Sequence, residues 1–202
     1  MILPSFSPTI QVSRSCFYHL RQLRSIRSSL SLHAVTTLVH ALICTRVDFG
    51  NAVYIGLSSD NTHKLQSIPN AAARLIGDIP KFAHISVYIR DSLHWLPVRK
   101  RIQFKTLTLM RNCIVGSAPS YFKELCTFVS SLPARPTLRS SSRGLLVVPR
   151  VHSATAQSRS FANVGPSIWN RLPLSLRLEL LSLSPSQFRK RLKTILFAGA
   201  SN

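Results

Sequence analysis

Apolar residues recur about once per helical turn through most of this chain, and Lys and Arg fill the positions between them. In residues 10–26, Cys16, Leu20 and Leu23 lie on one helical face. The basic residues of this segment include Arg21, Arg24 and Arg27. A period near 3.6 residues is the pattern of an amphipathic α-helix, so the segment predicts a helix with a basic outer face. Ser31 is expected to cap a second helix, antiparallel to the first.

A third helix is predicted to start at a cap residue, Asp60 or Thr62, and to end just before Gly77. Pro69 lies in its interior, where a proline lacks the N–H of an intrahelical hydrogen bond and costs about 3 kcal/mol. The sequence therefore predicts that this helix is kinked or is split near Ser67.

The junction His-Trp-Leu-Pro at residues 94–97 precedes a basic helix start. Pro97 suits the first turn of a helix and Trp95 is expected to anchor the junction in a core. The helix should run from Pro97 to about Val115, where Gly116 ends it. The side chains expected to face solvent or a polyanion are Arg99, Lys100, Arg101, Lys105 and Arg111.

The composition changes after residue 128. Residues 129–160 are rich in Pro, Ser and Arg and predict a mobile basic linker with a short strand at residues 145–148. Trp169, on one predicted helical turn, is expected to dock into a core. Ser184, Pro185 and Gln187 form a capping box ahead of the last helix, whose outer face carries Arg189, Lys190, Arg191 and Lys193.

These segments predict a mainly α fold and three parts of the chain. Residues 1–128 are expected to form a thumb-like helical bundle, residues 129–160 the linker, and residues 161–202 a C-terminal helical segment. The sequence leaves the oligomeric state open.

Charge limits the class of partner. The 202-residue chain has 26 Lys and Arg against 6 Asp and Glu, a formal net charge of +20, and 45% hydrophobic residues, enough for a core. Such an excess favours a polyanion, above all RNA or an RNA/DNA duplex bound through its backbone. The alternative for any single Lys or Arg is a merely solvated face, but solvated surfaces normally mix both signs.

The cysteines Cys16, Cys44, Cys113 and Cys126 have no metal-binding spacing and lie in apolar helical patterns. We interpret them as buried free thiols, in keeping with an intracellular location in the cytoplasm or nucleus. No stretch is as long as a membrane span, so no membrane partner is expected. Residues 1–47 contain no acid and are rich in Ser and Arg, which keeps a mitochondrial transit peptide as the minor alternative.

Motifs for catalysis are not found in the sequence. The six acids, Asp48, Asp60, Asp78, Asp91, Glu124 and Glu179, are widely spaced, and the histidines show no zinc spacing. No phosphate-binding Gly-Lys loop occurs either. We therefore predict no catalytic residue, no metal ligand and no cofactor in this chain, and a structural hydrogen bond for His94.

Short blocks of the chain resemble one family, in that family's order. The most distinctive is Leu-His-Trp-Leu-Pro-Val at residues 93–98. The others are residues 46–51, 64–66, 70–75, 118–121, 138–142, 147–150 and 165–173. Together they resemble the C-terminal part of the reverse transcriptase polyprotein of non-LTR retrotransposons, of the Rex-like and jockey-like groups, over most of the length.

The resemblance implies the thumb of an RNA-directed DNA polymerase and the region after it, gripping template and primer. That family's catalytic Asp pair lies in an upstream palm whose motif this sequence lacks. Pro69 stands where the family usually has Gln, and Phe49 and Gly50 replace Tyr and Cys. These departures, with Met1 just before the thumb, also suggest a truncated reading frame or a decayed fragment without selected function.

The leading hypothesis is a non-catalytic nucleic-acid-binding fragment, and the sequence does not separate RNA from DNA. The predicted phosphate-contacting residues are Arg21, Arg24, Arg27, Arg99, Lys100, Arg101, Lys105, Arg189, Lys190 and Lys193. The predicted structural anchors are Trp95, Pro97 and Trp169. A second hypothesis is a protein–protein interaction module in which Trp95 and Trp169 present an apolar patch. A third, a catalytic polymerase domain, requires carboxylates brought together by the fold.

Overall fold

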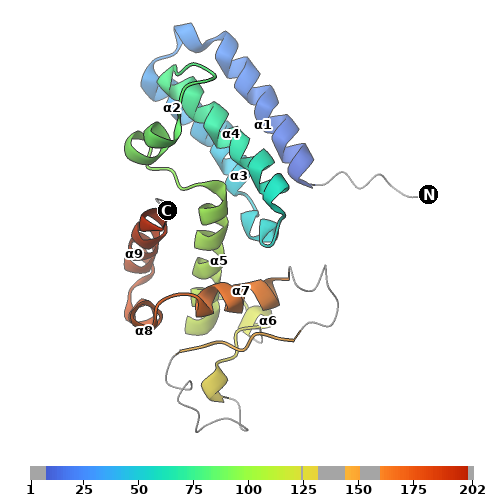
Figure 1. Ribbon diagram of the computed structural model, residues 1–202, viewed down its shortest axis with the longest axis vertical. Coiled ribbons are helices and arrows are strands. Elements are labelled where there is room, and N and C mark those ends of the chain that lie inside the picture. Colours follow the sequence, from blue (N-terminus) through green and yellow to red (C-terminus); the bar gives the residue numbers. More distant parts are fainter. Residues whose placement is uncertain (1–7, 124, 132–143, 151–159, 200–202) are drawn as a thin grey trace, which may run out of the picture. The chain divides into compact units, whose positions relative to one another are not determined.

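The computed structural model describes residues 8–123, 125–131, 144–150 and 160–199 of the chain (Figure 1). The α-helices in this part of the chain are α1 (Pro8–Ser25), α2 (Leu32–Val39), α3 (Thr45–Asp48), α4 (Ser59–Gly77), α5 (Val98–Val115), α6 (Ser120–Lys123), α7 (Phe161–Asn170), α8 (Leu174–Ser182) and α9 (Pro185–Ala198). The 3₁₀ and π elements are η1 (Arg27–Ser29), η2 (His40–Cys44), η3 (Asn51–Tyr54), η4 (Tyr88–Ser92) and η5 (Val129–Ser131). The predicted mainly α class is confirmed.

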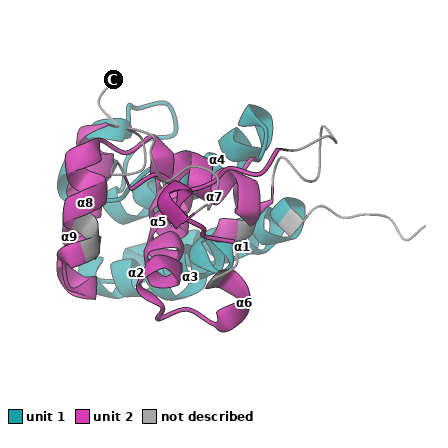
Figure 2. Ribbon diagram, turned by 90° about the horizontal axis from the view of Figure 1, so that it is seen from below, with its two compact units in different colours: residues 1–51, 57–99 teal, residues 52–56, 100–202 magenta. Residues whose placement is uncertain are grey.

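Two compact units divide the chain (Figure 2). The first comprises residues 1–51 and 57–99, and the second comprises residues 52–56 and 100–202. This division differs from the predicted ones after residues 128 and 160. Most of the predicted linker, residues 132–143 and 151–159, lies outside the described residues.

The first unit is built on three antiparallel helical segments. Figure 1 shows that α1, residues 32–48 and α4 alternate in direction. Their facing sides bury Leu20 and Leu23 of α1, Val35 of α2 and Leu65 of α4. The predicted cap is confirmed, because the Ser31 hydroxyl accepts a hydrogen bond from the Ala34 N–H at 3.2 Å. The predicted antiparallel pair is therefore part of a three-segment bundle.

Helix α4 differs from the prediction at its start and at Pro69. It begins at Ser59 with Ser58 at the N-cap, so neither Asp60 nor Thr62 caps it, and it runs without a break through Pro69. Pro69 and its neighbour Ile68 are buried. Packing of α4 against α1 and α2 holds the helix together across the missing hydrogen bond, and the predicted split near Ser67 is wrong.

The His-Trp-Leu-Pro junction is anchored as predicted. Trp95 is 7% exposed, its ring lies edge-on to the His40 ring at 5.4 Å, and its backbone N–H donates to the Ile89 carbonyl at 3.0 Å. Pro97 directly precedes α5, whose first N–H, that of Val98, donates to the Gln66 side-chain oxygen at 2.7 Å. An amide from α4 thus supplies a partner that the start of α5 lacks within the helix.

In the second unit Trp169 is fully buried and its indole N–H donates to the Gly144 carbonyl at 3.1 Å, which confirms its docking into a core. Its helix, α7, is longer than the single predicted turn and includes Pro166. Gly165 allows this helix to approach α5, because a Cβ at that position would lie 2.7 Å from the Met110 sulfur. A larger residue at this position would force α7 or the Met110 side chain to shift.

The short strand predicted at residues 145–148 is absent from the described residues, where Leu146 forms only an isolated antiparallel bridge with Phe128. The bridge is made by the Val129 N–H donating to the Leu145 carbonyl at 2.9 Å and the Val147 N–H donating to the Thr127 carbonyl at 2.8 Å. The backbone groups of Leu146 itself therefore face the opposite edge, where the side chain of Asn170 binds them. Its amide donates to the Leu146 carbonyl at 2.8 Å and accepts from the Leu146 N–H at 2.9 Å. These two bonds occupy the backbone groups that a further strand would need.

Helix α9 carries the predicted capping box, with Ser184 and Gln187 making both reciprocal bonds. Helix α8 was not predicted. Arg111 was expected to face outward and is buried, with its guanidinium 5.2 Å from the centre of the Phe188 ring and donating to the Leu183 carbonyl. The residues around the start of α9 cover this side of α5.

All four cysteines are buried and free, as predicted. Within the described ranges no helix is both long enough and apolar enough to cross a membrane.

Candidate nucleic-acid interface

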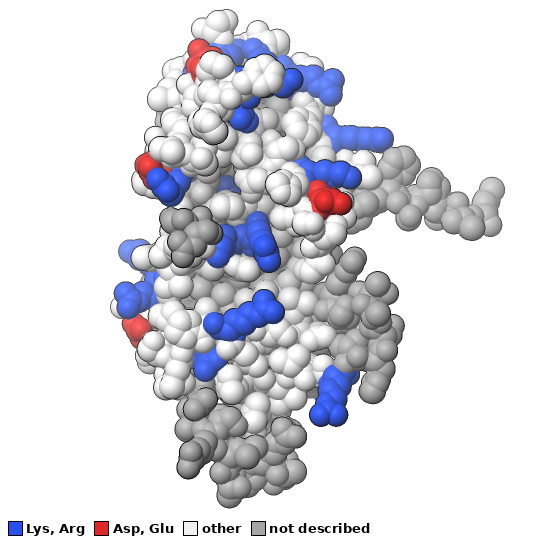
Figure 3. All heavy atoms as spheres, in the orientation of Figure 1, with Lys and Arg blue, Asp and Glu red and all other residues white. Residues whose placement is uncertain are grey.

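Most predicted phosphate-contacting side chains reach solvent. The exposed ones are Arg21, Arg24, Arg99, Lys105, Arg189, Lys190 and Lys193, and the half-buried ones are Arg27, Lys100 and Arg101. Figure 3 shows Lys and Arg spread over the visible face, with few acids among them. Six acids neutralise at most a small part of 26 cations, so most of the positive charge is left for solvent or a partner.

Arg27 has a structural role that its position in the sequence did not reveal. Its guanidinium donates to the carbonyls of Leu75, Ile76 and Leu30 at 2.9, 3.2 and 3.2 Å. The first two carbonyls belong to the last turn of α4, where backbone oxygens lack helical partners and the helix dipole is negative. Arg27 therefore closes the C-terminal end of α4.

Two other predicted residues, Lys100 and Lys193, have neighbouring groups that stabilise their positive charge. The Lys100 amine lies beside Gly199 at the C-terminal end of α9, 3.4 Å from where a Cβ of that glycine would be. The Lys193 amine lies over the Phe197 ring, 5.6 Å from its centre. Both positions are favourable for a cation and leave it at the surface of the second unit.

A basic pocket of about 590 Å³ lies in the first unit, at the C-terminal end of α4. It brings the predicted residues Arg24 and Arg27 together with Arg74 and Lys81, which were not predicted as site residues. Asp78 is the acid in its lining. Asp78 caps α4 in the left-handed backbone conformation, with φ of 51°, and so turns the chain into the loop that follows.

Arg74 positions that loop. Its guanidinium donates to the Ala83 carbonyl at 3.2 Å and to the Asn70 carbonyl at 3.5 Å. Its Nε is buried and has no hydrogen-bond partner in the protein. The loop between α4 and η4 is thus tied to the helix before it, and Lys81 is carried on the tied segment.

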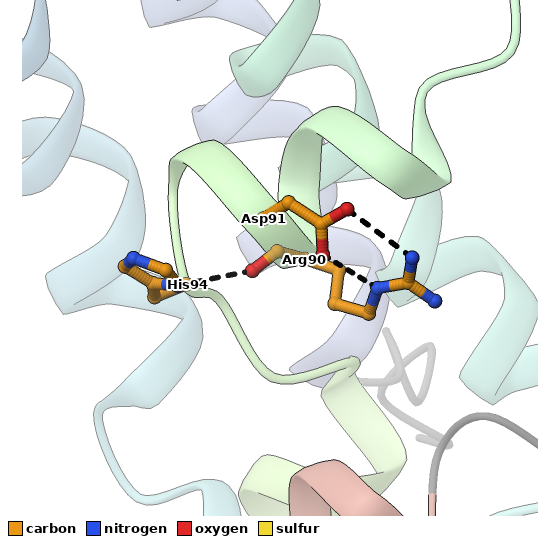
Figure 4. A network of polar contacts seen from close by, with 3 residues as sticks. All are labelled: Arg90, Asp91 and His94. Carbon is orange, nitrogen blue, oxygen red and sulfur yellow. Dashed lines mark hydrogen bonds and ion pairs between the residues drawn. The ribbon is translucent and has the colours of Figure 1, made fainter.

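Among the described acids, Glu179 and Asp91 have ion-pair partners: Glu179 of α8 lies 3.7 Å from the Arg191 guanidinium of α9, and Asp91 pairs with its neighbour in the sequence. Arg90 donates to both carboxylate oxygens of the adjacent Asp91, at 2.6 and 3.2 Å, and the His94 ring contacts the Arg90 carbonyl at 3.2 Å (Figure 4). Hydrogen bonding from Arg90 holds the pKa of the Asp91 carboxyl below its ordinary value. His94, with φ of 51°, shapes the turn before Trp95, in keeping with the predicted structural role.

Across the part of the chain that the structure describes, no three His, Cys, Asp or Glu side chains gather as metal ligands do.

The apolar surface differs from that expected for a tryptophan-based interaction patch. Trp95 and Trp169 are 7% and 0% exposed, so they belong to the interior and present no patch. The most exposed large apolar side chains are instead Phe82 at 92% and Phe49 at 85%. Phe82 follows Lys81, and the Lys81 amine lies 5.4 Å from the centre of its ring.

Arg74, Lys81 and Phe82 were not predicted from the sequence as residues of this site. Arg74 appeared only within a block that resembles a family, and nothing in the local pattern separates Phe82 from the other phenylalanines. Their juxtaposition depends on the turn at Asp78, which the spacing of apolar residues does not specify.

Comparisons with protein-family models, with curated proteins and with solved structures gave no match to this chain.

Proposed function

We propose that this chain is a non-catalytic nucleic-acid-binding fragment, derived from the thumb region of a retroelement RNA-directed DNA polymerase, that grips the backbone of template and primer. The observation that carries the proposal is the excess of exposed, uncompensated cations on a helical protein with a real core. The pocket that gathers four basic residues in the first unit, of which Arg24 and Lys81 are exposed, supports it. The family origin rests on the resemblance of the sequence blocks.

Backbone binding has a distinct salt signature. Each phosphate that the protein neutralises releases condensed counterions, so the logarithm of affinity falls linearly with the logarithm of salt, with a slope of about −0.9 per phosphate on duplex DNA. We expect a slope of several units for mixed-sequence duplex, measured by fluorescence anisotropy from low to physiological salt. A flat salt response would contradict the proposal.

A charge-matched pair of variants tests the contribution of α9. Replacing Arg189, Lys190 and Lys193 together by Gln should weaken binding and make the slope shallower by about 0.9 for each phosphate that is no longer neutralised. The control replaces three other exposed cations by Gln, namely Lys64, Arg150 and Arg171. Equal effects of the two variants on affinity would show that net charge alone, and not the α9 face, determines binding.

A further inference from the structure

The basic pocket of the first unit holds more hydrogen-bonding capacity than its own carbonyls use. Arg27 uses three N–H groups on main-chain oxygens, and a guanidinium has further N–H donors in the same plane. Arg74 likewise donates to two carbonyls through its two terminal nitrogens, each of which carries a second N–H. Donors fixed in this way need no reordering when an anion arrives, which lowers the entropic cost of binding.

The charge around the pocket favours a phosphate over a carboxylate. Arg24, Arg27, Arg74 and Lys81 carry four positive charges against the single carboxylate of Asp78. Guanidinium groups match the spacing of phosphate oxygens and bind them in pairs. Arg24 and Lys81 are exposed, so their cations meet an anion that enters from solvent.

An aromatic ring lies beside this pocket. Phe82 is 92% exposed. Its ring contacts the amine of Lys81, and Lys81 lines the pocket, so the ring lies next to the pocket. The loop that carries both residues is tied to α4 through Arg74 and Ala83. An exposed aromatic ring next to a cationic groove is the arrangement on which unpaired nucleic-acid bases stack, because every base has a π face.

We propose that this pocket binds one phosphate group of a single-stranded nucleic acid and that the adjoining unpaired base stacks on Phe82. The inference rests on the proposed function and makes it more specific. The first unit recognises an unpaired nucleotide, whereas the exposed Lys and Arg residues elsewhere bind the phosphate backbone of any nucleic acid. In a paired strand the base faces are covered by their neighbours, so duplex does not use Phe82.

The decisive experiment compares two exposed phenylalanines in the full chain. Phe82→Ala should weaken binding of a single-stranded oligonucleotide of about ten nucleotides by about fivefold to a hundredfold, the range for one stacked base. Phe82→Tyr should retain the affinity. Phe49→Ala is the matched control, because Phe49 is 85% exposed, lies in the same unit and does not line the pocket, and it should change nothing.

Two further arms separate the phosphate from the base. Lys81→Gln and Arg24→Gln should weaken binding of both the oligonucleotide and inorganic pyrophosphate, whereas Lys64→Gln, an exposed cation of α4 away from the pocket, should weaken neither. Phe82→Ala should leave pyrophosphate binding unchanged. All of these side chains are exposed, so the variants are expected to fold, and a circular dichroism melt checks this.

The inference is overturned if Phe82→Ala costs no more than Phe49→Ala, or if it weakens duplex binding as much as single-strand binding. It is also overturned if vesicles containing anionic lipid bind in the same Phe82-dependent manner, because the ligand is then a lipid headgroup. A flat salt response on duplex would instead contradict the backbone grip alone, and the phenylalanine comparison would still decide this site.

Discussion

Burial sets the chemistry of the cysteine side chains. Cys16 is fully buried, and desolvation of the thiolate raises its pKa from 9.0 to about 11. Burial similarly raises the pKa of Cys126 to about 12. Cys126 lies beside Met110, with their sulfurs 3.7 Å apart. Since the thiolate is the reactive form, these residues serve as small apolar core groups.

The thiols are therefore expected to resist modification in the folded protein. At pH 8 an aromatic disulfide reagent should react with the native chain only as fast as it unfolds, and rapidly in denaturant. Ser25→Cys, at an exposed position of α1, should add one fast-reacting thiol as a control. Fast reaction of several thiols in the native wild-type chain would contradict the burial.

The same shift predicts how stability depends on alkaline pH. The unfolded thiol of Cys16 loses its proton near pH 9.0, whereas the folded thiol keeps it until about pH 11. The folded state thus binds more protons between these values, so its stability is fully present below pH 9 and falls as the pH rises towards 11. The steepness of this fall, measured by urea unfolding, should decrease in Cys16→Ala.

At the scale of single elements, the N-caps of α9 and α4 differ in their hydrogen bonding. At the start of α9, Ser184 accepts from the Gln187 N–H while the Gln187 side-chain oxygen accepts from the Ser184 N–H. Ser58 occupies the same position before α4 but makes no side-chain cap bond. Ser184 and Ser58 thus occupy equivalent positions, but only the Ser184 side chain caps its helix.

Removing the cap at α9 should destabilise the protein. We expect Ser184→Ala to lower the free energy of unfolding by about 1 kcal/mol, because the N–H of Gln187 loses its acceptor. Ser58→Ala should change it little. Urea unfolding followed by circular dichroism measures both, and equal effects of the two substitutions would contradict the assigned capping box.

Pro69 imposes a cost that packing offsets. Replacing it by Ala restores an N–H donor to the interior of α4 and is expected to raise the free energy of unfolding by up to about 2 kcal/mol, the helical gain less the apolar packing of the ring. Pro80→Ala, in the exposed loop after α4, serves as the comparison and should have little effect. A marked loss of stability in Pro69→Ala would mean that the ring itself is needed in the core.

For the molecule as a whole, self-repulsion opposes the fold. A net charge of +20 on 202 residues acts against compaction, and salt screens it over about 10 Å at 0.1 M. The melting temperature should therefore rise with salt in the absence of nucleic acid, by about 2–4 °C for each kcal/mol of repulsion relieved. Reversing three exposed cations, Lys64, Lys105 and Arg171, to Glu should reduce this salt effect; an unchanged effect would attribute it to another cause.

Local pattern determined the helical class, most helix limits and the burial of Trp95 and Trp169, because the apolar period, capping residues and glycine stops act within a few neighbouring residues. The local pattern was misleading at Pro69, which does not break α4, and at Leu146, which forms a bridge and not a strand. At Pro69 the partners of α4 supply the packing that the local segment lacks, and at Leu146 the partner is the distant residue Phe128.

The excess of positive charge, and with it the expectation of a polyanion, follows from the sequence by itself. Which cations reach a ligand was decided only by the tertiary structure. Arg27 turns inward because carbonyls 48 and 49 residues away at the end of α4 lack helical partners. Arg111 does so because Phe188 and Leu183 cover it. The pocket beside Phe82 exists because Asp78 turns the chain back towards α1. The apolar period of a sequence predicts which face of one helix is buried, but it does not predict which residues of another helix pack against that face.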